Sequence, residues 1–152
     1  MKNSQLAGLV ILAMTGMTAK AQDLNQALKA IDAEKYEEAK TILTKYVATN
    51  PEDGKAAFLL GDVYLRQEVL DSAKMVFNRG LTAKNDNNYS YIGLGQLALD
   101  ENNAAAAKSN FDNATKGMRK KDTDEYIYVA KAYLNADQPN YKAAIEVLKK
   151  AL

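Results

Sequence analysis

Apolar residues recur three and four positions apart through most of the chain after residue 21, with polar residues between them. That spacing puts the apolar side chains on one face of an α-helix, whereas a strand would alternate strictly. Turn-forming residues interrupt the pattern at Asn50-Pro51-Glu52-Asp53 and at Asn85-Asp86-Asn87-Asn88. The pattern therefore predicts an all-α chain of short helices joined by turns.

The helical pattern repeats itself every 34 residues. The matching sets are Ala39, Ala73 and Ala107; Lys40, Lys74 and Lys108; Leu43, Phe77 and Phe111; and Leu60-Gly61 with Leu94-Gly95. A period of this length is typical of stacked supersecondary units. A lone helix pair cannot bury its apolar face, so each unit is expected to depend on its neighbours for stability.

The recurring residues resemble the tetratricopeptide repeat family, which carries Leu-Gly and Tyr in the first helix of each repeat and Ala and Phe in the second. The second repeat supplies Leu60, Gly61, Tyr64, Ala73 and Phe77, and the third supplies Tyr91, Leu94, Gly95, Ala107, Phe111 and Ala114. The resemblance implies a right-handed superhelical array of antiparallel helix hairpins. It divides the chain into about four repeats, over residues 22–53, 54–87, 88–122 and 123–152. The internal turn of the fourth, residues 135–140, is about two residues longer than the others.

The end of the array is unusual for this family. Leu152 falls where the second helix of the fourth repeat is expected to continue, and no polar capping helix follows it. We expect the array to continue in a longer chain. The alternative is a short protein that self-associates through its open C-terminal end.

The first 21 residues have the features of a secretory signal peptide. Lys2 precedes an apolar stretch from Leu6 to Met17, and Ala19 and Ala21 form the small-x-small pattern of a cleavage site. The stretch is too short to span a membrane. We expect cleavage before Gln22 and export to the periplasm or cell envelope, with no integral membrane segment after cleavage. The Ala-Gln junction resembles signal peptides of Bacteroidetes-type bacteria; an uncleaved anchor or a buried N-terminal helix is the alternative.

Composition removes several classes of function. The chain has no Cys and no His, which excludes the commonest metal ligands and the commonest general base. Its 20 basic and 19 acidic side chains leave a net charge of +1, so no electrostatic argument favours nucleic acid as a partner. Glu34, Glu37 and Glu38 are interpreted as solvated ion pairs, and residues 100–103 as a turn between helices. We therefore predict no cofactor, no metal and no enzymatic activity.

The resemblance also implies a binding surface, because the first helices of these repeats line a concave face that holds peptides or protein segments. Its lining residues here are Leu24, Leu28, Ile31, Lys55, Phe58, Asp62, Leu65, Tyr89, Ile92, Gln96, Leu99, Asp124, Ile127, Lys131 and Leu134. Phe58 and Ile92 are expected to be apolar anchors. Lys55, Asp62, Gln96 and Lys131 are expected to set register. The alternative is that superhelical curvature buries these rows.

One subfamily of these repeats binds the C-terminal carboxylate of cytosolic chaperones, using Lys and Asn side chains on the concave surface. This chain is excluded from that subfamily, because it carries no Lys or Asn at the matching positions. Those positions hold Leu24, Leu28, Leu59, Tyr89 and Gly93. The sequence therefore predicts an exported scaffold that binds another protein or peptide through its concave surface. The alternatives are an accessory domain of a longer cell-envelope enzyme or assembly factor, and a self-associating structural module.

Overall fold

A computed structural model describes residues 20–119 and 122–152. A first helix covers residues 20–32 and is followed by α2 (Tyr36–Thr49), α3 (Gly54–Arg66), α4 (Leu70–Gly80), α5 (Asn88–Asp100), α6 (Ala104–Thr115), α7 (Thr123–Asn135) and α8 (Tyr141–Lys149). No strand occurs in these ranges. Most of the predicted signal peptide lies outside them, in residues 1–19.

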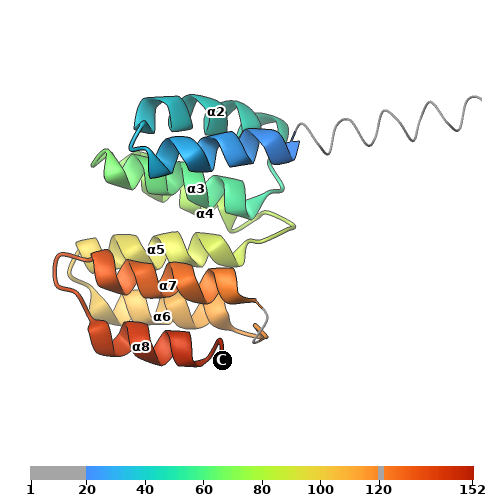
Figure 1. Cartoon of the computed structure of the whole chain (residues 1–152). Coiled ribbons are helices and arrows are strands. Elements are labelled where there is room, and N and C mark those ends of the chain that lie inside the picture. Colours follow the sequence, from blue (N-terminus) through green and yellow to red (C-terminus); the bar gives the residue numbers. More distant parts are fainter. Residues whose placement is uncertain (1–19, 120–121) are drawn as a thin grey trace, which may run out of the picture.

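The helices pair in chain order and the pairs stack into a solenoid (Figure 1). The helix over residues 20–32 pairs with α2, α3 with α4, α5 with α6, and α7 with α8. The first helix of each later pair also packs on the pair before it, as α5 does on both α3 and α4. This is the repeat array that the 34-residue period predicts.

The turn inside each of the first three repeats ends its helix in the same way. Glu34, Glu68 and Asn102 lie 34 residues apart and have positive φ angles of 57°, 60° and 58°. The amide of the next residue then donates to a carbonyl five residues back, as Val69 N does to Tyr64 O at 2.9 Å. This is the Schellman arrangement, which usually places glycine at the left-handed position.

Phe77 shows why small residues recur in the first helices. Its buried ring packs against Gly61 of α3, in its own repeat, and Gly93 of α5, in the next. A methyl group at either glycine would overlap the ring. The two glycines therefore let three helices meet around one aromatic side chain, which gives the array its core.

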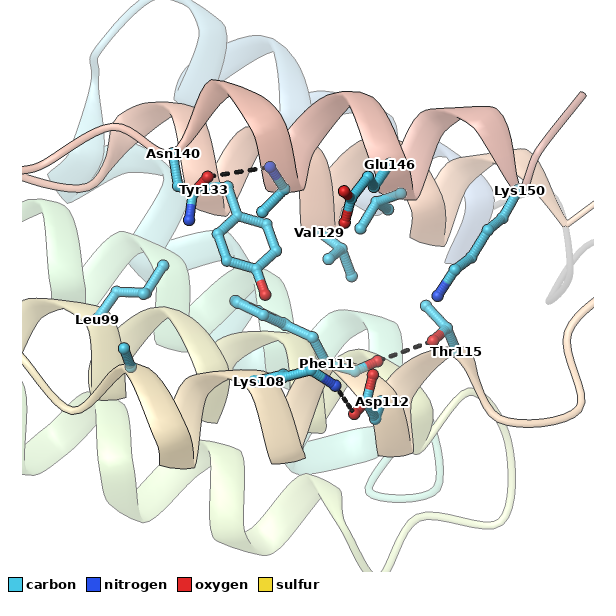
Figure 2. Close-up of a pocket in the computed structure, with 13 residues that line it drawn as sticks. Leu99, Lys108, Phe111, Asp112, Thr115, Val129, Tyr133, Asn140, Glu146 and Lys150 are labelled. Atoms are coloured by element: carbon cyan, nitrogen blue, oxygen red, sulfur yellow. Dashed lines mark hydrogen bonds and ion pairs between the residues drawn. The ribbon is translucent and has the colours of Figure 1, made fainter.

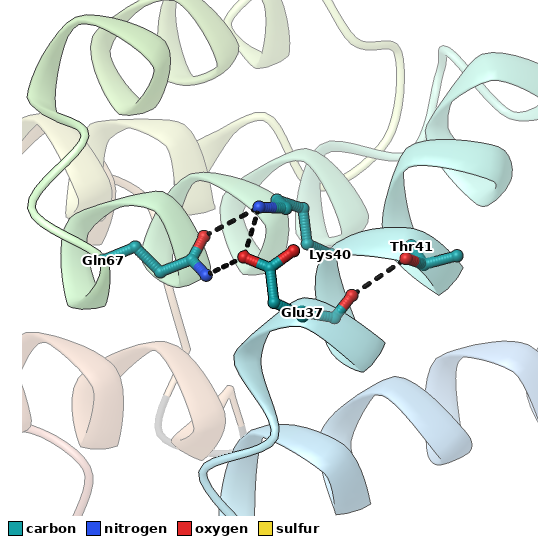
Figure 3. Close-up of polar contacts among 4 residues, drawn as sticks. All are labelled: Glu37, Lys40, Thr41 and Gln67. Carbon is teal, nitrogen blue, oxygen red and sulfur yellow. Dashed lines mark hydrogen bonds and ion pairs between the residues drawn. The ribbon is translucent and has the colours of Figure 1, made fainter.

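Polar contacts tie neighbouring repeats together at both ends of the helices. At one end, Asn85 N of the second repeat donates to Glu52 O of the first at 3.1 Å, and Gly54 N donates to Asn85 O at 2.9 Å within the second. At the other, Lys40 of α2 donates to Glu37 at 2.6 Å and to Gln67 at 3.3 Å (Figure 3). Gln67 also donates to Glu37, and these bonds hold the Glu37 pKa below its usual value.

The fourth repeat departs from the other three. Five residues, 136–140, separate α7 from α8, whereas three, 67–69, separate α3 from α4. This agrees with the longer turn expected from the sequence.

The first helix of the fourth repeat also carries a large residue where the third repeat has glycine. Val129-Ala130 in α7 matches Leu94-Gly95 in α5, so Tyr128 occupies the position of Gly93. A tyrosine cannot pack as closely on the preceding hairpin as glycine does, and α7 packs more on α5 than on α6.

Candidate protein-binding groove

Helix α7 lies across the face formed by the first helices of the array. Tyr128 meets Phe58 of α3 edge-on, with ring centroids 5.1 Å apart, and meets Tyr89 of α5 at 5.7 Å. Phe58 and Tyr89 are themselves 5.7 Å apart. The three rings come from three different repeats and form one aromatic cluster. Edge-on and tilted ring pairs of this kind are favourable beyond their buried area.

Charged and polar groups surround this cluster. Lys55 Nζ of α3 lies 3.0 Å from Asp124 Oδ2 of α7, and the same ammonium lies 5.2 Å from the Tyr89 ring centroid. Asn88 of α5 donates to Glu125 of α7 at 3.2 Å. Burial raises the pKa of both Tyr89 and Tyr128, so these phenols stay protonated at neutral pH. Contacts from two earlier repeats thus hold α7 in place.

This packing corrects the expectation that two apolar rows are exposed along the groove. Six predicted lining residues are buried, namely Ile31, Phe58, Asp62, Leu65, Tyr89 and Ile92. Phe58 and Ile92 therefore cannot be surface anchors in this conformation. For Phe58 and Tyr89 part of the cover comes from Tyr128 of α7, which the array brings onto α3 and α5.

The remaining lining residues keep some exposure. Leu24, Leu28, Lys55, Gln96 and Leu99 are half-buried, and Asp124, Ile127, Lys131 and Leu134 are exposed. Ile127 and Leu134 are 41% and 40% exposed. With Lys131 between them at helical spacing, they form a stripe along one face of α7. Their role in binding stays a prediction.

Beneath α7 the groove narrows to a cavity of about 80 Å³. Its walls come from the helix over residues 20–32 and from α3, α5 and α7, and they include Leu28, Phe58, Asp62, Gln96 and Lys131. Arg66 Nε lies 2.9 Å from Asp62 Oδ2 in the same wall. Ligand pockets usually exceed about 300 Å³, so this cavity is too small to hold a folded segment of another chain.

A larger cleft, which the sequence did not reveal, lies between α6 and α8 (Figure 2). Its volume is about 390 Å³, and Phe111, Val129 and Tyr133 are among its lining residues. Lys108 Nζ at the cleft lies 2.6 Å from Asp112 Oδ2, so these two charges are paired with each other. No sequence signal marks this cleft, because it depends on the distance between two helices that do not pack on each other.

The described residues hold no group of three Asp or Glu side chains placed to bind a metal ion. No helix among them is long and apolar enough to cross a membrane.

Comparisons with known proteins agree with this architecture. Residues 30–97 match the model of a tetratricopeptide repeat family. The crystal structure of MamA has 17% sequence identity and a TM-score of 0.55, over 87% of this chain and 75% of that one. The structure of YrrB, described as a TPR protein with an unusual peptide-binding site, has 21% identity and a TM-score of 0.49, over 89% and 68% of the two chains. No curated protein matches the chain. The family model covers less than half of the chain, and the stacked hairpins confirm the predicted fold, a solenoid of antiparallel helix hairpins.

Proposed function

We propose that this protein is a scaffold that binds another polypeptide along the exposed face of α7, at the edge of the concave groove. The observation that carries the proposal is the stripe of Ile127, Lys131 and Leu134. Two large aliphatic side chains are left in solvent on the helix that closes the groove. Exposed apolar residues of this kind on one helix face are typical of a protein-binding surface.

The chemistry of the chain supports recognition rather than catalysis. The tetratricopeptide repeat fold is typically a non-catalytic interaction module. The residues along α7 can supply apolar contact from Ile127 and Leu134 and one charge from Lys131. Apolar anchors with a nearby charge provide affinity and orientation, respectively.

The test is an affinity capture from cell-envelope extract using the full chain and two variants. Ile127→Glu combined with Leu134→Glu places two charges on the stripe, and we expect it to lose a specifically bound protein. Met75→Glu is the matched control, because Met75 is an exposed apolar residue on α4. Equal recovery by all three proteins contradicts the proposal. Circular dichroism on each variant checks that its helices remain folded.

We also propose that the scaffold acts outside the cytoplasm, in the periplasm or cell envelope. The support is the sequence of residues 1–21, with its basic start, apolar stretch and Ala19-x-Ala21 site. The intact mass of the protein recovered from the envelope fraction tests this. A chain beginning at Gln22 is the expected result, and a full-length chain found in the cytoplasmic fraction contradicts it.

A further inference from the structure

The face of α7 that covers the aromatic cluster is arranged as a bound helix would be. Asp124 and Tyr128 are four residues apart, so they share one side of α7. Lys55 and Phe58 are three residues apart and share one side of α3. Asp124 Oδ2 lies 3.0 Å from Lys55 Nζ. The ring centroids of Tyr128 and Phe58 are 5.1 Å apart. A carboxylate and a ring of α7 thus meet an ammonium and a ring of α3.

Helix α5 completes the surface that receives this side of α7. The Tyr89 ring lies 5.7 Å from the rings of both Phe58 and Tyr128, and the Lys55 ammonium lies above it. Phe58 and Tyr89 are 2% and 3% exposed, and Tyr128 supplies part of their cover. The receiving site is therefore a pocket of two rings beside one cation. Recognition of a helix in a groove uses such parts, an aromatic anchor for affinity and a charge for orientation.

Stacking of the repeats does not require the Tyr128 ring. The matching residue is Leu59 in α3 and Gly93 in α5, so no ring stands at this position in those two helices. The fourth repeat packs on the third through a different aromatic pair, Tyr133 and Phe111, whose ring centroids are 4.7 Å apart. Tyr128 instead reaches past the third repeat into the second. Its ring is an occupant of the groove in addition to the repeat interface.

The attachment of α7 to the third repeat leaves room for it to tilt. Helix α5 packs about equally on α3 and α4, whereas α7 packs more on α5 than on α6. A cleft of about 390 Å³ separates α6 from α8 (Figure 2). In the connection 116–122, Gly117 has a φ of 77° and open space around it, and the backbone bonds among its described residues are local. Limited packing and local bonding of this kind are typical of segments that open at low cost.

We infer that α7 is an autoinhibitory helix, whose Tyr128 ring occupies the Phe58 and Tyr89 pocket until α7 tilts away from α3. The partner that takes its place is a helix of another protein with an aromatic residue four positions after an Asp or Glu. Its ring replaces that of Tyr128, and its carboxylate pairs with Lys55. Because α7 must first leave the pocket, the native chain binds this partner more weakly than an open pocket does. The inference concerns the buried side of α7 and does not rest on the function proposed for its exposed side.

The test uses a fluorescent, helix-stabilised peptide with the sequence of residues 122–135, and a second peptide in which alanine replaces its Tyr128. Anisotropy with the full chain measures binding. Tyr128→Ala in the protein removes the internal ring and should bind the tyrosine peptide about tenfold tighter than the native chain does. Tyr141→Ala, at an exposed tyrosine, is the matched control and should leave the affinity unchanged. The alanine peptide should bind each protein at least about tenfold more weakly.

A second variant opens the pocket without removing a ring from it. Asp124→Lys places a like charge against Lys55, so it should bind the tyrosine peptide more tightly than the native chain does. The Lys55 and Asp124 side chains are 28% and 62% exposed, so this gain should shrink as salt is raised. Circular dichroism checks that each variant keeps its helices.

A crosslink tests whether α7 has to move. The chain contains no Cys, so Lys55→Cys combined with Asp124→Cys gives one pair that a short bismaleimide can join. The joined protein should lose peptide binding, and the same protein before joining should retain it. Lys74→Cys with Glu101→Cys is the matched control, because this pair lies 4.0 Å apart and links the second and third repeats. Joining the control pair should leave binding unchanged.

Three results would overturn the inference. One is equal affinity of the native chain, Tyr128→Ala and Asp124→Lys for the tyrosine peptide, and another is no binding by any of them. The third is unchanged binding after α3 and α7 are joined, because the peptide would then lie outside the pocket. The Ile127→Glu, Leu134→Glu variant should bind the peptide as the native chain does, which keeps this test separate from that of the exposed side of α7.

Discussion

Tyr128 of α7 stands edge-on to Phe58 of α3, with ring centroids 5.1 Å apart, although 70 residues of sequence separate the two. The pair joins the fourth repeat to the second and covers a ring that the sequence pattern would leave facing solvent. Most contacts in a repeat array are between adjacent repeats. The contact between Tyr128 and Phe58 passes over the third repeat. It therefore affects which part of the concave face a partner can reach.

Removing that ring should loosen α7. We expect Tyr128→Ala to lower the free energy of unfolding by about 2 kcal/mol, because it removes a half-buried aromatic side chain and uncovers Phe58. Chemical denaturation followed by circular dichroism measures the change. Tyr141→Ala is the control, since Tyr141 is exposed and its loss should cost less than about 0.5 kcal/mol. Equal effects of the two substitutions would show that α7 does not depend on the Phe58 contact.

Replacing Glu68, which has a left-handed backbone conformation in the turn of the second repeat, should stabilise the protein. Glu68 has a φ of 60° and is exposed, so its side chain adds strain without making a buried contact. We expect Glu68→Gly to raise the free energy of unfolding by roughly 0.5–1 kcal/mol. Asn102→Gly should gain less, because asparagine tolerates this conformation better. A loss of stability in Glu68→Gly, measured by urea denaturation, would contradict the strain argument.

Ser90 carries a fully buried hydroxyl that has no hydrogen-bond partner among the described residues. It lies against Gly80 of α4, where an added methyl group would overlap the Ser90 hydroxyl. We expect Ser90→Ala to stabilise the protein by about 1 kcal/mol, because it removes an unsatisfied polar atom from the core. Gly80→Ala should destabilise the native chain and cost less in the Ser90→Ala background. Additive effects in a double-mutant cycle would argue against direct contact between the two positions.

The Tyr46 hydroxyl donates to Asp53 Oδ2 at 2.9 Å, where α2 leads into α3. Burial and this carboxylate raise the pKa of Tyr46 to about 12, from 10 in an unfolded chain. The folded state therefore holds the phenol proton more tightly than the unfolded state does. The stability from this group is complete below pH 10 and is lost as the pH rises toward 12.

Tyr46→Phe should test this linkage. At pH 7 the variant loses the hydrogen bond and about 1 kcal/mol of stability. Between pH 10 and 12 its unfolding free energy should fall less steeply than that of the native chain, as measured by urea denaturation across that range. Parallel pH profiles for the two proteins would show that Tyr46 does not contribute to the alkaline loss.

Sequence by itself determined the helical repeat, because helix periodicity, turn residues and the small residues of the first helices are local properties. Glu34, Glu68 and Asn102 keep the 34-residue spacing, and their turns share one backbone geometry. The same spacing pairs Gly61 with Gly95, and the longer turn of the fourth repeat is also visible in the sequence. The pattern thus predicted both the helices and their pairing.

Only the tertiary structure decided which of the predicted groove residues a partner can reach. Phe58 and Ile92 occupy first-helix positions that the repeat pattern places on the concave face, but both are buried in the folded array, and Tyr128 of α7 covers Phe58. The packing of α7 on α3 depends on Tyr128 and on the Lys55–Asp124 ion pair, which join repeats far apart in the chain. A repeat pattern describes how each unit contacts its neighbour, so it does not specify the curvature accumulated over several units. Exposure along the groove follows from that curvature.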